Sequence, residues 1–387
     1  MNLSWFIASR LKFRGKIVSA SIAVSFLIMI VAVSVSSGFR QEIRNGISSA
    51  AGDVQLTPPD LNVLNEGAPV EFDVAYISRI RQLDYVSEIR PAAYRAGIVK
   101  EGENIHGVLF KGCEGIFSDS LALPVSIPER LAEITGLESG DKMTAYFVGN
   151  TVKARKFNIV GVHKAMLKTD DKLVVYASLG DIQRLNGWDS TQVSAVEVIL
   201  DDKSVNAMSE ASQQIGTIVN AYSTDSSHPV IATSAVSRYR QLFDWLNLID
   251  FNVMFILILM TIVAGFNMIS GLLIILFENT SAIGLLKSLG MKDRSIASVF
   301  LAGAASFVFK GMAVGNAIAL IFCLIQKKFQ FLKLDPDNYF VSFVPVNIDW
   351  GMILLCDLVS FAAIMLFLLI PCLFISKVDP AKTVRYS

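Results

Sequence analysis

Four long apolar stretches constrain this chain more than any other feature of its sequence. They are residues 16–38, 246–277, 296–326 and 350–376, and they carry almost no charge. About 20 apolar residues in an α-helix span the hydrocarbon core of a bilayer. We therefore predict an α-helical membrane protein with four transmembrane helices.

Basic residues around these stretches predict the side of the membrane on which each connecting segment lies, because Lys and Arg collect on the cytoplasmic side. They are Arg10, Lys12, Arg14 and Lys16 before the first span, Lys287, Lys292 and Arg294 after the second, and Lys377, Lys382 and Arg385 after the fourth. The connector 278–295 is thus predicted to be cytoplasmic, as are both ends of the chain. Residues 39–245 and 327–349 are predicted to lie outside.

The two cytoplasmic ends differ in character. Residues 1–15 alternate bulky apolar side chains with basic ones, which is typical of a helix lying on the inner leaflet. Residues 377–387 form a short tail. The first apolar stretch is longer than the core of a signal peptide, so we expect it to be retained as a span.

Composition argues against several classes of function. The 34 basic and 34 acidic residues cancel, so the net charge does not indicate nucleic-acid binding. The three histidines and four cysteines are scattered, which predicts neither a metal site nor a disulfide framework. The sequence has no Gly-x-x-x-x-Gly-Lys-[Ser/Thr] phosphate loop and no nucleophile–base constellation. We expect a non-enzymatic chain without a cofactor of its own.

Residues 39–245 are predicted to contain a mixed α/β domain that binds a partner or transmits force. Alternating apolar residues predict strands, and helical spacing with turn signals predicts helices. The predicted strands are Val54–Leu56, Gly107–Phe110, Met143–Phe147, Phe157–Val162, Lys172–Tyr176 and Ser194–Leu200, and the predicted helices are Val74–Leu83, Ile127–Thr135, Ser178–Leu185 and Ser204–Ile218.

Two apolar seams predict helices that lead from the membrane into this domain. Phe39, Ile43 and Ile47 continue the first span at intervals of four residues. The seam that leads into the second span comprises Tyr239, Leu242, Leu246, Ile249 and Val253. The pattern indicates either a stalk of two helices beneath the outer domain or ordinary packing within one subunit.

The connector 278–295 gives the most specific local prediction. Its pattern predicts a short helix, Ser281–Leu289, which Gly290 ends. Ile283, Leu286 and Leu289 fall on one face, and we expect nothing else in the chain to cover that face. Such a helix is either a docking surface for a partner protein or a turn that lies on lipid headgroups.

Charged side chains within the spans need partners, because a charge in hydrocarbon costs about 3 kcal/mol or more. Lys310 and Asp357 are candidates for an ion pair, for separate polar contacts, or for an ion relay, and their predicted depths in the membrane differ. The residues expected to join helices without charge are Asn267 and Asn316, through hydrogen bonds, and Gly311 and Gly315, through close packing.

Motifs spread over almost the whole chain resemble those of one transporter family. Glu278 and Ile283–Met291 resemble its Glu-Ile-x-x-Leu-Lys-x-Leu-Gly helix, although Ala282 replaces an acidic residue. Lys310 stands where the family often has Gln-Gly or Glu. The other matching segments are Val35–Ile43, Ala264–Ser270, Ile370–Pro371 and Asp379–Tyr386. In this order, the motifs resemble the four-span permeases of the FtsX/MacB/LolC-LolE group of ABC systems, and most closely the lipoprotein-releasing LolC/LolE branch.

The resemblance implies mechanotransmission in a bacterial inner membrane. A separate ABC ATPase, in two copies, would bind ATP and magnesium and hold the connector helix in a groove. Its work would pass to the periplasmic domain and extract lipoproteins from the outer leaflet for transfer to the outer membrane. The further partners implied are a second permease, copy or paralogue, and a periplasmic lipoprotein chaperone. The alternatives are a MacB-like efflux permease and an FtsX-like regulator of cell-wall hydrolases.

The resemblance also assigns roles to residues. Those expected to couple to the ATPase are Glu278, Ile283, Gly284, Leu286, Lys287, Leu289 and Gly290. Those expected to border a substrate path between the first and second spans are Ser25, Val33, Phe39 and Met260. The link Gly149–Arg155 is shorter than the hook by which one subunit type in the family grips the chaperone, which predicts a subunit without a hook.

Overall fold

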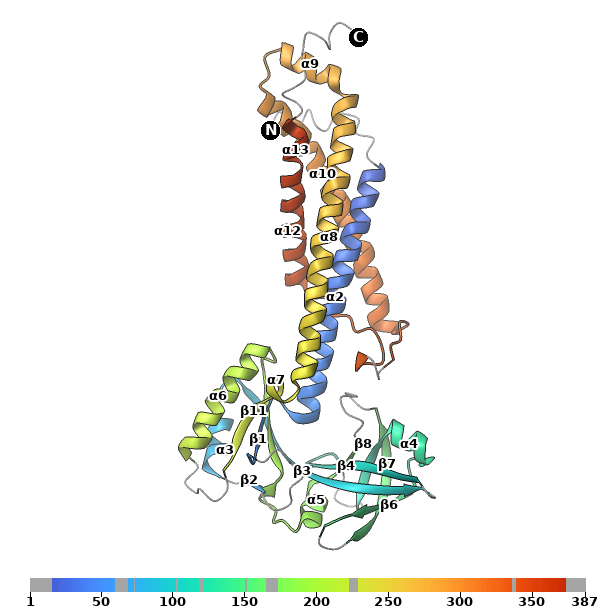
Figure 1. Ribbon diagram of the computed structural model, residues 1–387, viewed down its shortest axis with the longest axis vertical. Helices are drawn as coiled ribbons and strands as arrows, with labels where there is room; N and C mark the ends of the chain where they lie inside the picture. The colour runs from blue at the N-terminus through green and yellow to red at the C-terminus, as the bar shows by residue number, and fades with distance from the viewer. Residues whose placement is uncertain are drawn as a thin grey trace. The chain divides into compact units, whose positions relative to one another are not determined.

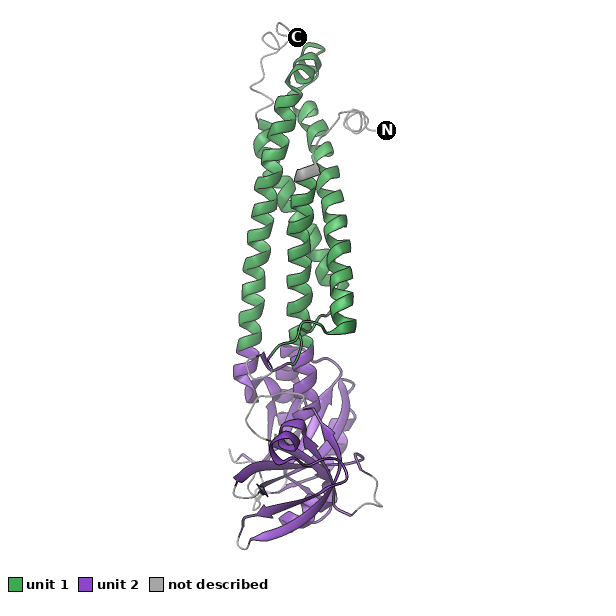
Figure 2. Ribbon diagram, turned by 90° about the vertical axis from the view of Figure 1, so that its right-hand side faces the viewer, with its two compact units in different colours: residues 1–41, 245–334, 342–387 green, residues 42–244, 335–341 purple. Residues whose placement is uncertain are grey.

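The computed structural model of the chain has two compact units (Figure 2). Unit 1 comprises residues 1–41, 245–334 and 342–387, and unit 2 comprises residues 42–244 and 335–341. The structure describes residues 16–59, 69–72, 74–101, 104–117, 122–149, 152–164, 173–222, 229–335 and 339–373. The predicted interfacial helix at 1–15 and the tail at 377–387 lie outside these ranges.

Long apolar helices build unit 1. They are α2 (Lys16–Ala51), α8 (Arg240–Glu278), α10 (Asp293–Phe329) and α12 (Trp350–Phe367), which α13 (Leu369–Cys372) continues (Figure 1). All four are long and apolar enough to cross a membrane. They confirm the predicted fold class in its membrane part. Helices α2 and α8 each contribute residues to both units.

Helix α2 is the most buried of the four spans. Of its most apolar window, 44 % is buried within the chain, against 17–28 % in the other three. Its contact with α10 depends on glycine: a Cβ on Gly315 would lie 2.4 Å from the carbonyl oxygen of Ala23, and one on Gly311 would lie 2.8 Å from Ile22. The close helix approach predicted from these two glycines is therefore confirmed.

Unit 2 combines an open sheet with a barrel. Its strand order is β11-β1-β10-β3-β4-β8-β5-β7-β6, and β3 also pairs with β6, so six strands from β3 to β6 close on themselves. The strands are β1 (Val54–Thr57), β3 (Val86–Glu101), β4 (Asn104–Cys113), β5 (Pro124–Pro128), β6 (Lys142–Phe147), β7 (Lys153–His163), β8 (Leu173–Ser178), β10 (Ala195–Leu200) and β11 (Ile231–Ser234), with a separate pair β2 (Val70–Glu71) and β9 (Gln192–Val193). Phe110, Phe147 and Phe157 fill the barrel, with ring centroids 5.0–6.1 Å apart.

The helices of unit 2 are α3 (Ala75–Arg81), α4 (Glu129–Thr135), α5 (Leu179–Asn186), α6 (Val205–Tyr222) and α7 (Ala235–Arg238). The predicted mixed α/β class is confirmed. One local prediction needs correction, and one strand was missed. Ile127–Pro128 belong to β5 rather than to the following helix, because this strand pairs with β7 and β8. The longest strand, β3, was missed because Glu88, Arg90 and Pro91 interrupt its apolar alternation.

The chain enters and leaves unit 2 through neighbouring strands. Two residues separate the end of α2 from the start of β1, and β11 leads through α7 into α8. Strand β1 pairs with β11 on one edge, from Val54–Ser234 to Thr57–Ile231, and with β10 on the other. The segments that join this unit to the first and second spans are thus linked by one antiparallel ladder.

We expect Gly315→Leu to destabilise unit 1 by about 1–3 kcal/mol or more, because the added side chain must push α10 away from the α2 backbone. The measurement is denaturant unfolding of the protein in detergent. Ala317→Leu adds a side chain on the exposed face of the same helix, and it should leave the midpoint unchanged. Equal midpoints for the two variants would contradict the close packing of α10 on α2.

Candidate functional site

The connector between the second and third spans folds as helix α9 (Thr280–Ser288). The predicted stop at Gly290 is confirmed, since this residue has a φ of +85°. The amide of Gly290 donates to the carbonyl of Lys287 at 2.9 Å, and that of Met291 donates to Leu286 at 3.0 Å. This paired hydrogen-bond pattern is the Schellman motif, which ends a helix at a glycine and fixes the direction in which the chain leaves.

One side of α9 is covered by the chain itself, which corrects the expectation of an uncovered apolar face. Ile283 is buried in the cluster that contains Leu276 of α8 and Ile296 of α10, and Leu286 packs against the same cluster. The ends of α8 and α10 supply this cover. Lys287 adds an ion pair to Asp293 at the start of α10, with 3.0 Å between Nζ and Oδ1.

The outer side of α9 presents a different pair of leucines to solvent. Leu285 is 57 % exposed and Leu289 is 76 % exposed. Sequence reasoning selected Leu289 and missed Leu285, although their spacing of four residues places them on the same side of a helix. Glu278 is also exposed, whereas Gly284 is buried. Within the described chain, nothing covers the two leucines, and we call Leu285 and Leu289 the connector surface.

The polar side chains within the spans join neighbouring helices. Asn267 of α8 donates to Ser21 of α2 at 2.6 Å. Asn316 of α10 donates to Asp357 of α12 at 2.6 Å, and Asp357 is buried. Both asparagines therefore make the interhelical hydrogen bonds that the sequence predicted. Since a buried carboxyl group needs a donor, the bond from Asn316 stabilises the contact between α10 and α12.

Lys310 and Asp357 do not form the ion pair that was one alternative from the sequence. Both residues lie within the described helices and no ion pair joins them. Lys310 is exposed, with its Nζ 5.9 Å from the centre of the Phe307 ring. Asp357 contacts Asn316, which stands six residues beyond Lys310 on α10. Six helical residues correspond to about 9 Å of depth, so the difference in depth excludes the pair.

Sequence reasoning missed a contact of three helices. The hydroxyls of Thr261 on α8 and Ser360 on α12 are 3.2 Å apart, and both lie 3.6 Å from the sulfur of Met29 on α2. Single hydroxyls in an apolar helix carry little signal, and that of Thr261 also donates to the Leu257 carbonyl of its own helix at 2.8 Å. The two hydroxyls and the Met29 sulfur link α2, α8 and α12 at one level of unit 1.

The predicted substrate-path residues are mostly buried within this chain. Ser25, Val33 and Phe39 of α2 are buried, and Met260 of α8 is half-buried. The side chains that α2 and α8 do expose include Val24, Phe255 and Ile258. These exposed positions are the better places from which to test contact with a substrate.

The outer parts of α2 and α8 within unit 1 are paired. Phe39 meets Trp245 edge to face, with ring centroids 5.7 Å apart. Asp250 accepts from Arg40 at 2.5 Å and from Ser36 at 2.7 Å. Leu246 is buried in the single chain, as ordinary packing within one subunit requires. At this end of unit 1, α2 and α8 are therefore held together by an aromatic contact, an ion pair and a hydrogen bond.

These features define a class of protein: a multi-pass membrane protein with an extracytoplasmic α/β domain between its first and second spans. Residues 254–380 match the family model described as FtsX-like permease C-terminal, so this part of the chain is similar to the FtsX-like permeases. Members of this family are non-catalytic membrane subunits of ABC-type transporters, and such subunits work with a partner ATPase.

Curated relatives match almost the full chain at low identity. The lipoprotein-releasing system transmembrane protein LolC of Neisseria meningitidis is 24 % identical, over 95 % of this chain and 92 % of its own. The corresponding LolE of Haemophilus influenzae is 21 % identical, over 99 % of both chains. The crystal structure of the periplasmic region of MacB from Actinobacillus actinomycetemcomitans covers 50 % of this chain and 95 % of its own, with 12 % identity and a TM-score of 0.33.

We expect Asn316→Leu to destabilise unit 1 by about 1–3 kcal/mol, because it leaves the buried Asp357 carboxyl group without its donor. Adding Asp357→Leu to that variant should recover most of the loss, since it removes the carboxyl group that Asn316→Leu leaves without a donor. Unfolding in detergent of the wild type, both single variants and the double variant gives the interaction energy. Additive effects would contradict a direct contact.

Proposed function

We propose that this chain is the permease subunit of an ABC transporter that extracts lipoproteins from the outer leaflet of a bacterial inner membrane for transfer to the outer membrane. The observation that carries the proposal is the exposed connector surface on a helix that is itself held firmly against α8 and α10. A rigid helix with an apolar outer side suits docking into a partner protein, and movement of the helix moves both spans.

The energy for extraction must come from outside this chain. Removing acyl chains from a bilayer costs about 0.8 kcal/mol per CH₂ group, so a lipid-anchored protein does not leave spontaneously. The sequence carries no phosphate loop. We therefore propose that two ATPase subunits bind ATP and magnesium, dock on the connector helices of a pair of permeases, and supply the work. No cofactor is assigned to this chain.

The lipoprotein cargo is proposed from the relatives, whose names describe a lipoprotein-releasing system. The pairing partner is a second copy of this chain or a paralogue. The β6–β7 hairpin supports a subunit without a chaperone hook: Phe147 pairs directly with Lys153, so only residues 148–152 join the strands. A periplasmic chaperone would then be gripped by the other permease subunit or bind this one elsewhere.

Replacing both leucines of the connector surface, as Leu285→Asp/Leu289→Asp, should weaken ATPase association at least about tenfold, because buried apolar anchors dominate protein interfaces. Association is measured by co-purification and by titration of the purified ATPase. Ile105→Asp places a carboxylate at an exposed apolar position on β4 and should leave association unchanged. Undiminished ATPase binding by the double variant would refute the docking assignment.

Photocrosslinking tests the cargo separately from the ATPase. A photoreactive residue at Val24 or Phe255, on the exposed sides of α2 and α8, is expected to capture acylated protein in cells. Leu354 of α12, which is at least as exposed as these two positions, serves as the control and should capture much less. Capture of non-acylated molecules only would favour a MacB-like efflux permease or an FtsX-like regulator instead.

A further inference from the structure

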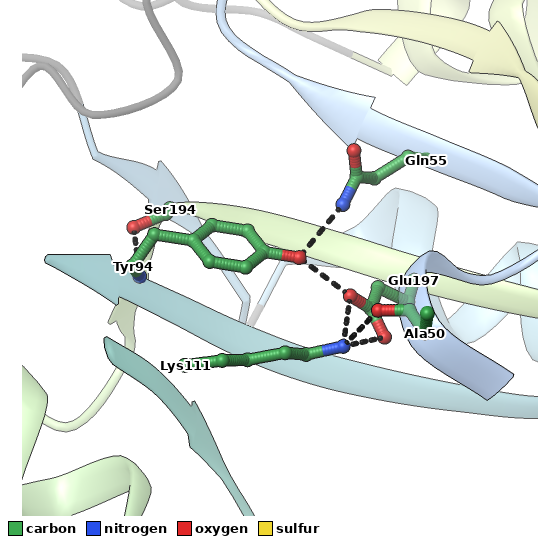
Figure 3. Close-up of polar contacts among 6 residues, drawn as sticks. All are labelled: Ala50, Gln55, Tyr94, Lys111, Ser194 and Glu197. Atoms are coloured by element: carbon green, nitrogen blue, oxygen red, sulfur yellow. Dashed lines mark hydrogen bonds and ion pairs between the residues drawn. The ribbon is translucent and has the colours of Figure 1, made fainter. Parts of the chain in front are cut away.

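The end of α2 that lies in unit 2 is held by a charge that comes from the sheet. The last turn of α2 contains no basic residue, although the free carbonyls at a helix C-terminus favour a cation. Lys111 of β4 supplies it: its Nζ donates to the carbonyl oxygen of Ala50 at 2.6 Å (Figure 3). The helix end and the fourth strand are thereby joined by a direct, charged hydrogen bond.

All three N–H donors of Lys111 are used in hydrogen bonds. A lysine ammonium group has three N–H donors, and the two that Ala50 does not use go to Glu197 of β10, with 2.7 Å to Oε1 and 2.9 Å to Oε2. Lys111 is 4 % exposed and Glu197 is 2 % exposed. Each donor therefore has one acceptor, and the geometry of this buried pair fixes where the Ala50 carbonyl group must lie.

The same network crosses four neighbouring strands. Tyr94 of β3 donates to Glu197 at 2.7 Å, and Gln55 of β1 donates to the Tyr94 hydroxyl at 3.2 Å (Figure 3). Burial, together with the Glu197 carboxylate, raises the pKa of Tyr94 well above its usual value, so this residue remains a neutral donor. The strands β1, β10, β3 and β4 are consecutive in the sheet. The network thus connects the open sheet to two strands of the barrel.

The backbone after Ala50 is fixed on the same strand, β10. Gly52 has a φ of +73°, and a Cβ there would lie 2.9 Å from Cβ of Glu197. The Asp53 amide donates to the Val198 carbonyl at 2.9 Å, and the Asp53 carboxyl group accepts from Ser48 at 3.1 Å and from the Leu200 amide at 2.8 Å. The last turn of α2 is thus attached to the sheet by side chains and backbone together.

Stability alone does not explain why this ion pair is buried. A protein with apolar residues of the same volume in place of a buried ion pair is often as stable or more stable. An apolar pair would fill the space between β4 and β10, but it would not bond to the carbonyl group of Ala50. What Lys111 and Glu197 add to packing is therefore the fixed position of the α2 terminus.

We propose that Lys111 and Glu197 are positioning residues that fasten the end of α2 to the sheet, so that displacement of this span moves the barrel strands. The inference rests on the proposed function, because it assigns the residues through which ATP-driven movement of the first span would reach the outer domain.

The test uses the full-length permease with its ATPase in proteoliposomes. Lys111→Met/Glu197→Leu replaces the buried pair with apolar side chains, so the domain should stay folded, with an unchanged thermal midpoint. Amide exchange in a peptide covering 44–51 should rise about tenfold, and lipoprotein released per ATP hydrolysed should fall by a similar factor. Arg90→Met, which breaks an exposed ion pair with Glu88 on β3, is the control and should change neither quantity.

The outcomes separate the two proposals. Wild-type exchange and wild-type release per ATP in the folded double variant would overturn the role of Lys111 and Glu197. Absence of ATP-dependent release by the wild type would defeat the proposed function, and amide exchange would still decide whether the pair holds the helix end. If Lys111→Met alone fails to fold, the double variant retains the test, because it leaves no buried charge unpaired.

Discussion

Burial of helix α2 is the constraint on which the rest of this structure depends. Within hydrocarbon, polar backbone groups are satisfied inside each helix, so the spans meet only through side chains and through close approach at small residues. Glycines of α10, an asparagine of α8 and a serine of α12 all make contacts with α2. A change in the position of α2 therefore has to be accommodated by every other span.

The two ends of the bundle have different chemistry. At one end, α9 lies on the ends of α8 and α10 and leaves its connector surface exposed. At the other, α2 and α8 are paired by Arg40 and Asp250, and within unit 2 the strands that follow α2 and precede α8 are neighbours. An input at the connector can thus reach α2 through packed helices, and the buried Lys111–Glu197 pair gives the end of α2 a defined attachment.

Sequence patterns predicted the features that depend on local periodicity. They did not predict the features that depend on tertiary contacts. The four spans, the Gly290 stop and the close packing at Gly315 follow from apolar runs and small residues. The buried side of α9 did not, because local periodicity does not show whether the flanking ends of α8 and α10 pack over that side. Lys111 and Glu197 each stand alone in an apolar strand, which signals a buried charge, but their sequence separation of 86 residues hid the pairing. Of the alternatives open for Lys310 and Asp357, the ion pair is excluded by a difference in depth that the sequence already indicated, whereas the contact of Asp357 with Asn316 was not foreseen.

The central claim is that the chain receives a push on the cytoplasmic side and produces movement on the other side of the membrane. Labelling of single cysteines by a membrane-impermeant maleimide in intact spheroplasts tests it most directly, with Leu289→Cys in α9 and Ile105→Cys in β4 as the two exposed sites in a cysteine-free background. We predict that Ile105→Cys reacts in intact spheroplasts and that Leu289→Cys reacts only after permeabilisation. Reaction of both sites from the outside would contradict the account.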